Sequence, residues 1–124
     1  QVEDGQTGMD YRFQRVQERF QAQAQTGQVA FHRMFSDQAA AVIEDGSLGW
    51  AYIDGNHLYE YVLKDLQIYY EKVRPGGILA GDDYGQRGWW KDGVTRALEA
   101  FTQTLPGVHA LVIADQFLLQ KPLK

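Results

Sequence analysis

The sequence predicts an α/β fold with a largely parallel sheet that ends in an antiparallel hairpin. Short apolar runs alternate with helix-length amphipathic segments, which is the pattern of strands joined by crossover helices. Two of these runs end in acidic clusters, Asp54-Gly55-Asn56-His57 and Asp82-Asp83-Tyr84. A strand-helix-strand connection returns the chain to the same edge of the sheet in the same direction. We therefore expect both clusters to meet at the carboxyl edge, where open α/β sheets bind ligands.

Length and composition are those of one ordinary globular domain. The chain has 124 residues, of which 44% are hydrophobic and 23% charged. We expect a single domain over residues 1–124, with a polar segment and helix at 1–27 and an α/β core at 28–124. The net charge of -4 argues against nucleic acid or an anionic membrane as the partner. The absence of cysteine, and of any apolar run near the ~20 residues of a membrane span, favours a cytoplasmic protein.

The first half of the chain predicts two helices and two strands. Apolar residues at helical spacing predict a solvent-facing helix at Tyr11–Gln25. The short apolar runs Val29–Met34 and Leu48–Ile53 predict strands. Between these two runs, Ser36 is a suitable N-cap for a helix that ends at Asp45-Gly46.

The second half predicts two helices, a buried strand and the hairpin. An apolar stripe predicts a helix at Leu58–Val73, which the turn Arg74-Pro75-Gly76-Gly77 ends. Ile78–Gly81 is short and apolar, as buried strands are. The remaining segments are a helix capped by Asp92 that reaches Phe101, and two strands at Val108–Ile113 and Gln116–Gln120 that are close enough to pair.

Three carboxylates in the two clusters are candidate metal ligands. Carboxylate oxygens suit hard divalent cations such as Mg²⁺. Asp54, Asp82 and Asp83 would repel one another without a cation, and a bound cation would relieve that cost. The alternative is that Asp54 caps the following helix while Asp82 or Asp83 only solvates a loop.

His57, three residues after Asp54, is a candidate general base, because imidazole exchanges protons near neutral pH. The alternative is a histidine at a helix start that bonds to a neighbouring carbonyl. The aromatic segment from Tyr84 to Trp90 is a candidate acceptor pocket. For Trp89 and Trp90 the alternative is packing in a lid or between subunits.

The residues also resemble a known family. The resemblance is to the carboxyl half of class I S-adenosylmethionine-dependent methyltransferases. It is carried by the run Tyr52–Glu60, then Leu63 and Asp65, the run Val73–Tyr84, and then Gly93-Val94 and Phe101. They are most similar to the small-molecule O-methyltransferases that bind a divalent metal. The resemblance implies a partial Rossmann-like sheet and methyl transfer to a hydroxyl of a sugar, phenol or natural product.

The resemblance also implies roles for particular residues. It assigns a divalent cation, Mg²⁺ or another, to Asp54, Asp82 and Asp83, and the base to His57. It assigns S-adenosylmethionine to Phe35, Ser36 and Asp54. The acceptor would lie against Tyr84, Trp89 and Trp90, whose aromatic faces suit sugars and the sulfonium by cation-π interaction.

One part of the family pattern has no counterpart in this sequence. The amino-terminal strands with the glycine-rich loop that cradles the cofactor, and the acidic residue that holds its ribose, are missing. Enzymatic activity would therefore require that this loop be supplied. The alternative is a truncated, non-catalytic half-domain that serves as an assembly or interaction module. Because a half-domain exposes unpaired edges, we also expect a homo-oligomer.

Overall fold

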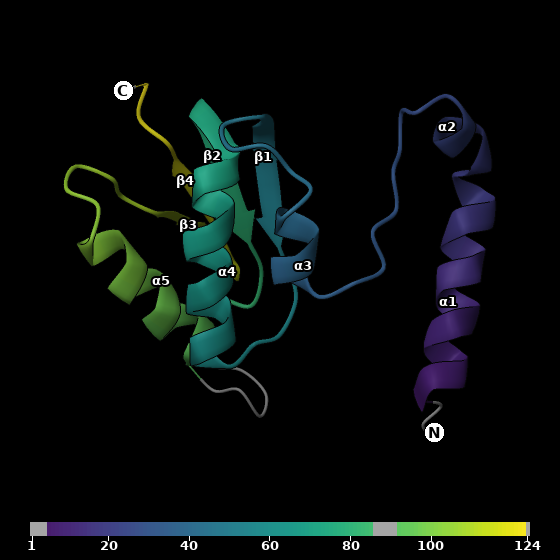
Figure 1. Ribbon diagram of the computed structural model, residues 1–124. Coiled ribbons are helices and arrows are strands. Elements are labelled where there is room, and N and C mark those ends of the chain that lie inside the picture. The colour runs from purple at the N-terminus through teal and green to yellow at the C-terminus, as the bar shows by residue number, and fades with distance from the viewer. Residues whose placement is uncertain (1–4, 86–91, 124) are drawn as a thin grey trace. The chain divides into compact units, whose positions relative to one another are not determined.

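The computed structural model describes residues 5–85 and 92–123 (Figure 1). They fall into two compact units, Gln1–Met34 and Phe35–Lys124. The larger unit contains the whole of the described sheet. No described helix is both long and apolar enough to cross a lipid bilayer.

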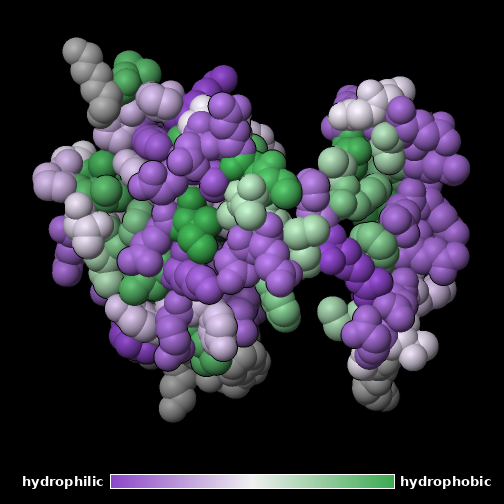
Figure 2. Space-filling model, in the orientation of Figure 1, coloured by the Kyte–Doolittle hydropathy of each residue, from purple (hydrophilic) through white to green (hydrophobic). Residues whose placement is uncertain are grey.

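The smaller unit is a helical segment followed by irregular chain. Helices α1 (Gly5–Arg19) and α2 (Gln21–Gln25) confirm the helix expected at 11–25, although it begins earlier and is interrupted at Phe20. Neither helix has a buried residue, which agrees with a solvent-facing surface, and hydrophilic residues cover much of this unit in Figure 2.

The prediction of a strand at Val29–Met34 is wrong. This run is irregular, with the Met34 N–H donating to the His32 carbonyl at 3.0 Å. Phe31 packs edge to face on Phe13, with ring centroids 6.1 Å apart. A strand needs a neighbouring strand to pair its backbone groups. Because no described strand pairs with this run, local turns and the ring contact decide its conformation.

The larger unit contains a four-stranded sheet in the order β1-β2-β4-β3. Its strands are β1 (Leu48–Ile53), β2 (Val73–Gly81), β3 (Leu111–Ile113) and β4 (Gln116–Gln120). β1 and β2 pair in parallel, whereas β2 with β4 and β3 with β4 pair antiparallel. The α/β class and the terminal antiparallel hairpin are therefore confirmed.

Two of the larger unit's helices build the core. α4 (Tyr59–Lys72) and α5 (Gly93–Gln103) lie together on one face of the sheet (Figure 1). Their apolar sides meet the inward residues of β2 and β4, which removes apolar surface from water. The buried residues of this core are Val62, Leu66, Leu79, Val94, Ala97, Leu98, Phe101, Val108, Phe117 and Leu119.

The short helix α3 (Ser36–Ala40) differs from the one that the sequence predicts. Phe35 occupies the N-cap position and Ser36 is the first helical residue, so the cap prediction is wrong by one position. The Gln38 side chain accepts a hydrogen bond from the Phe35 N–H at 3.2 Å and takes over part of the capping. The Ser36 hydroxyl is thereby available for the long-range contact described below.

The turn expected at Arg74-Pro75-Gly76-Gly77 is part of β2, although α4 does end just before it. Gly76 has a φ of +82°, a conformation that glycine adopts at little cost. Its N–H donates to the Lys121 carbonyl at 2.8 Å, and the Lys121 N–H donates to the Gly77 carbonyl at 2.8 Å. This pairing with a distant part of the chain overrides the local preference for a turn.

Gly81 provides a test of how tightly the sheet packs. A Cβ atom built at Gly81 would lie 2.5 Å from Phe117 Cε2 and 2.9 Å from the Ile53 carbonyl oxygen. We expect Gly81→Ala to lower the free energy of unfolding by about 1–3 kcal/mol, because overpacked cores shift side chains and backbone. Thermal or urea unfolding measures this change.

Gly49→Ala is the matched control, because its nearest neighbours are atoms of the Arg74 side chain at 3.7 Å or more. Its effect should stay within about 0.5 kcal/mol. Equal stability of the Gly81→Ala and Gly49→Ala variants would contradict the packing described for Phe117.

Candidate functional site

The two acidic clusters lie together at the carboxyl ends of β1 and β2. Asp54 directly follows β1, and Asp82 and Asp83 directly follow β2. The parallel register pairs Ile53 with Gly81, so the residues that follow each strand are neighbours. The Asp82 N–H donates to the Ile53 carbonyl at 3.2 Å and extends this pairing past the end of β2.

Asp54, His57 and Asp83 form the tightest group at this edge. Each offers one ligand atom, and these atoms all lie within 4.8 Å of one another. His57 Nε2 lies 2.5 Å from Asp83 Oδ2, with 26% and 17% of the two side chains exposed. The arrangement can bind a cation or hold a histidine that exchanges protons.

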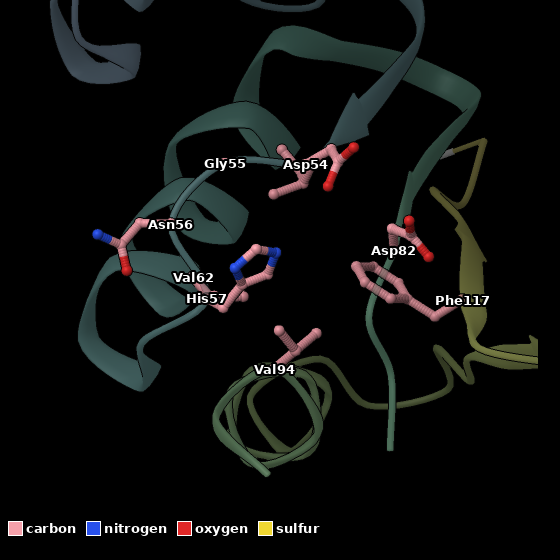
Figure 3. Close-up of a pocket in the computed structure, with 9 residues that line it drawn as sticks. Asp54, Gly55, Asn56, His57, Val62, Asp82, Val94 and Phe117 are labelled. Atoms are coloured by element: carbon pink, nitrogen blue, oxygen red, sulfur yellow. The ribbon is translucent and has the colours of Figure 1, made fainter. Parts of the chain in front are cut away.

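Asp82 is oriented differently from Asp83. Its Oδ1 accepts a hydrogen bond from the Asp83 N–H at 2.8 Å. It still lines the small pocket that contains Asp54 and His57 (Figure 3). Of the three predicted metal ligands, the structure thus brings Asp54 and Asp83 close to His57, while one oxygen of Asp82 is engaged by backbone.

The backbone of Asp83 directs its side chain toward His57. Asp83 has a φ of +65°, which non-glycine residues adopt at a cost and aspartate tolerates better than most. The next residue is fixed, because the Tyr84 N–H donates to the Asp115 carbonyl in the β3–β4 turn at 2.8 Å. The terminal hairpin therefore helps to hold the acidic segment in this strained conformation.

The turn that carries His57 is held by α5. A Cβ atom built at Gly93 would lie 2.5 Å from the His57 carbonyl oxygen and 3.1 Å from the Tyr59 nitrogen. Only a glycine lets the first turn of α5 approach this backbone so closely. Within the turn, the Leu58 N–H donates to the Asn56 side chain at 2.9 Å.

The surroundings of Asp54 raise the cost of ionising its carboxyl group. Partial burial raises the pKa of Asp54, and the negative charges of Asp82 and Asp83 raise it further, while His57 lowers it. Burial and the same carboxylates also raise the pKa of the Tyr52 phenol. The site is therefore electronegative and favours a positively charged ligand.

Two hollows adjoin Asp54. The smaller one, of about 10 Å³, is close to the volume of one water-sized sphere. Its apolar base consists of Val62, Val94 and Phe117 (Figure 3). The larger one has about 290 Å³ and is lined by Ser36, Leu48, Trp50, Ala51, Tyr52, Ile53, Asp54, Gly55, Asp65 and Tyr69. We call the larger hollow the β1 cavity.

Of the residues predicted to bind the cofactor or the acceptor, only some line a described cavity. Ser36 and Asp54 line the β1 cavity, whereas Phe35 does not line it and is 78% exposed. Tyr84 is partly buried and packs against the core. The predicted acceptor residues Trp89 and Trp90 lie outside the described residues.

Residue-level reasoning from the sequence assigned no site role to eight of the ten residues that line the β1 cavity, and four of these eight have aromatic or charged side chains. Trp50 and Tyr52 lie two residues apart on β1 and project from the same face of the sheet. This spacing indicates a strand but does not indicate a cavity. Asp65 and Tyr69 lie one turn apart on α4. Asp65 was detectable in principle, because it is a charged residue next to the apolar stripe of this helix.

Comparison with known proteins now identifies the family. The family model of a methyltransferase domain matches residues 3–84, more than half of the chain. The chain belongs to this methyltransferase domain family. The match confirms the resemblance to class I S-adenosylmethionine-dependent methyltransferases and makes S-adenosylmethionine the expected cofactor.

One relative and two solved structures add to the comparison. The methyltransferase domain is 42% identical over 73 residues to the uncharacterized protein R132 of Acanthamoeba polyphaga mimivirus, covering 59% of this chain and 28% of the relative. A crystal structure of a Corynebacterium glutamicum protein matches with a TM-score of 0.61 and 15% identity, over 79% of this chain and 50% of that one.

The second solved structure is a putative rRNA-methylase from Clostridium thermocellum. It matches with a TM-score of 0.66 and 11% identity, over 85% of this chain and 64% of that one. At these identities both structures show the fold alone, and they confirm the Rossmann-like methyltransferase sheet. The methyltransferase domain therefore spans 28% of the viral relative and no more than 64% of either solved structure.

The raised pKa of Asp54 gives a stability prediction for the cation-free chain. When the pKa of a carboxyl group is higher in the folded state than in the unfolded state, the folded state becomes less stable as the pH rises through the folded-state pKa. We expect Asp54→Asn to remove this loss and to raise the melting temperature at pH 7, in a chelator, by about 1–3 °C. The difference in melting temperature between the variant and the wild-type chain should vanish at about pH 3, where Asp54 is protonated in both the folded and the unfolded state.

Asp45→Asn is the control, because Asp45 is an exposed acid that pairs with Lys72 at 2.8 Å, outside the site. It should give no gain in melting temperature at pH 7. A lower melting temperature for Asp54→Asn than for the wild-type chain at pH 7 would show that the acids do not repel one another as described.

Proposed function

We propose that this methyltransferase domain, once the missing glycine-rich cofactor loop is supplied, transfers the methyl group of S-adenosylmethionine to a hydroxyl of a small molecule, with the help of a divalent cation such as Mg²⁺. One observation carries the proposal: in a chain of this family, Asp54, His57 and Asp83 offer ligand atoms within 4.8 Å of one another. A sugar, a phenol or a natural product is the proposed acceptor. The negative net charge disfavours a nucleic-acid acceptor.

The chemistry of the donor set fits a divalent cation. The two carboxylates suit Mg²⁺ and Mn²⁺, whereas the imidazole suits ions such as Fe²⁺ and Zn²⁺. Asp54 and Asp83 would hold the ion. Asp82 lines the small pocket beside Asp54 and His57 and is a further oxygen donor. When bound, such an ion lowers the pKa of a coordinated hydroxyl.

His57 is the proposed proton acceptor for the hydroxyl of the substrate. Its contact with Asp83 supports this role, because a neighbouring carboxylate stabilises the imidazolium that forms when the ring takes a proton. Asp83 would then orient the ring as well as carry charge. The alternative, that His57 serves as a ligand itself, is compatible with the same distances.

The β1 cavity is the proposed site of S-adenosylmethionine, which supplies an electrophilic methyl group when bound. The cavity's volume of about 290 Å³ lies near the lower end of small-molecule sites. Asp54 and Asp65 give it negative charge, and Trp50 and Tyr52 give it aromatic surface. Both features favour a cationic sulfonium compound. Tyr84, Trp89 and Trp90 remain the proposed acceptor contacts. Phe35 precedes Ser36 without lining the cavity, so it is the proposed contact of an adenine that extends past Ser36.

A metal-binding experiment tests the proposed role of the acids. We expect Asp83→Asn to weaken the binding of Mn²⁺, measured by calorimetry, by about tenfold or more, because it removes one charged ligand. Asp45→Asn is the control variant and should bind Mn²⁺ as the wild-type chain does. Methyl transfer that continues unchanged in the presence of a chelator would refute the part of the proposal that concerns the metal.

The second candidate function is an assembly module that forms a homo-oligomer. It is favoured by the apolar face of the sheet on the side away from α4 and α5. The strand register aligns Tyr52, Ala80, Leu118 and Leu111 in one row, beside a row of Trp50, Ile78 and Gln120. Trp50 is 66% exposed and Leu111 59% exposed. Neither row contains a charged side chain, so a second copy that packs on these rows buries no charge from them.

Sedimentation at several concentrations tests this second candidate. We expect the wild-type chain to dimerise in a concentration-dependent way and Trp50→Glu to shift it toward the monomer, since a charge on this face must be desolvated. Tyr61→Glu is the control, because Tyr61 is 53% exposed on α4. A wild-type chain that stays monomeric at every concentration would exclude self-association. The proposed setting for either function is the cytoplasm.

A further inference from the structure

Asp65 is the only charged side chain among the described residues that is buried, with 9% of its surface exposed. It lies in the middle of α4, next to residues of the core. A buried carboxylate is costly unless it is hydrogen bonded. Asp65 meets this condition through Ser36, whose hydroxyl donates to Asp65 Oδ1 at 2.6 Å although the two residues are 29 positions apart.

A second residue of α4 holds the same segment. Tyr69 lies one helical turn after Asp65, so the two side chains project from the same side of the helix. The Tyr69 hydroxyl donates to the Ser36 carbonyl at 2.7 Å. Ser36 is therefore fixed at both its hydroxyl and its carbonyl, by two residues that also line the β1 cavity.

The other oxygen of Asp65 faces the turn after β1. A Cβ atom built at Gly55 would lie 3.7 Å from Asp65 Oδ2. Asp65 thus stands between two segments of the cavity wall, the start of α3 at Ser36 and the turn Asp54-Gly55. An apolar residue would fill this place without the cost of burying a charge, but it would not hold Ser36.

We infer that Asp65 is a positioning residue of the cofactor site: it sets the spacing of Ser36 and the Asp54-Gly55 turn in the wall of the β1 cavity. The inference rests on the proposed function, in which this cavity binds S-adenosylmethionine. Asp65 acts through Ser36, which lines the cavity and which the family resemblance assigns to the cofactor. A merely structural role predicts something different, namely loss of stability without loss of affinity in the molecules that remain folded.

The experiment measures the affinity of the full chain for S-adenosylhomocysteine by calorimetry, with thermal unfolding of each variant alongside. We expect Ser36→Ala and Asp65→Ala each to weaken binding about tenfold or more. Ser36→Thr, which keeps a hydroxyl, should recover part of the affinity lost in Ser36→Ala. Because Ser36 is exposed, its variants report on the contact even if Asp65→Ala unfolds.

The double variant and a matched control complete the design. The two residues act as one unit, so Ser36→Ala combined with Asp65→Ala should bind no more than about twofold more weakly than Asp65→Ala alone. Asp37→Ala is the control, because Asp37 follows Ser36 but pairs with Lys64 at 2.9 Å and does not line the cavity. Its affinity should equal that of the wild-type chain.

Two results would overturn the inference. If the wild-type chain binds S-adenosylhomocysteine and folded Ser36→Ala and Asp65→Ala bind it equally well, Asp65 serves only stability and the proposed function stands. If the wild-type chain does not bind it at all, the proposed function fails and the inference fails with it.

Discussion

The parallel pairing of β1 with β2 is the constraint on which the candidate site depends. It places Ile53 beside Gly81, so Asp54 and the Asp82-Asp83 pair leave the sheet as neighbours. A register shift by one residue would turn these side chains to the opposite face of the sheet. Gly81 permits this register, since any side chain there would collide with Phe117 and with the Ile53 carbonyl.

The apolar core and the acidic edge support each other. Val62, Val94 and Phe117 belong to the core and also form the base of the small pocket. They limit the access of water to Asp54 and His57 from below, which strengthens the interactions between charges at the edge. The core gains stability from apolar burial, whereas the acids lose some of it to mutual repulsion. Such a balance is common where a site is built to bind a charged ligand.

The sequence predicted elements well where a local pattern coincided with long-range contacts. The apolar stripe of α4 and the hairpin at the carboxyl end are of this kind, and both are confirmed. The predictions were wrong where contacts with residues far away in the sequence determine the backbone conformation. Val29–Met34 has the composition of a strand but no described strand beside it. Pro75-Gly76-Gly77 has the composition of a turn, yet its backbone pairs with the segment around Lys121.

The sequence by itself determined the α/β class, the family and the fact that acidic residues end two successive apolar runs, because periodicity and motif spacing are local properties of a chain. Only the tertiary structure decided that Asp83 rather than Asp82 meets His57, since this depends on a backbone φ of +65° that the β3–β4 turn helps to hold. It also decided that Asp65 reaches Ser36. Contacts between residues far apart in the chain follow from packing, which no short pattern encodes.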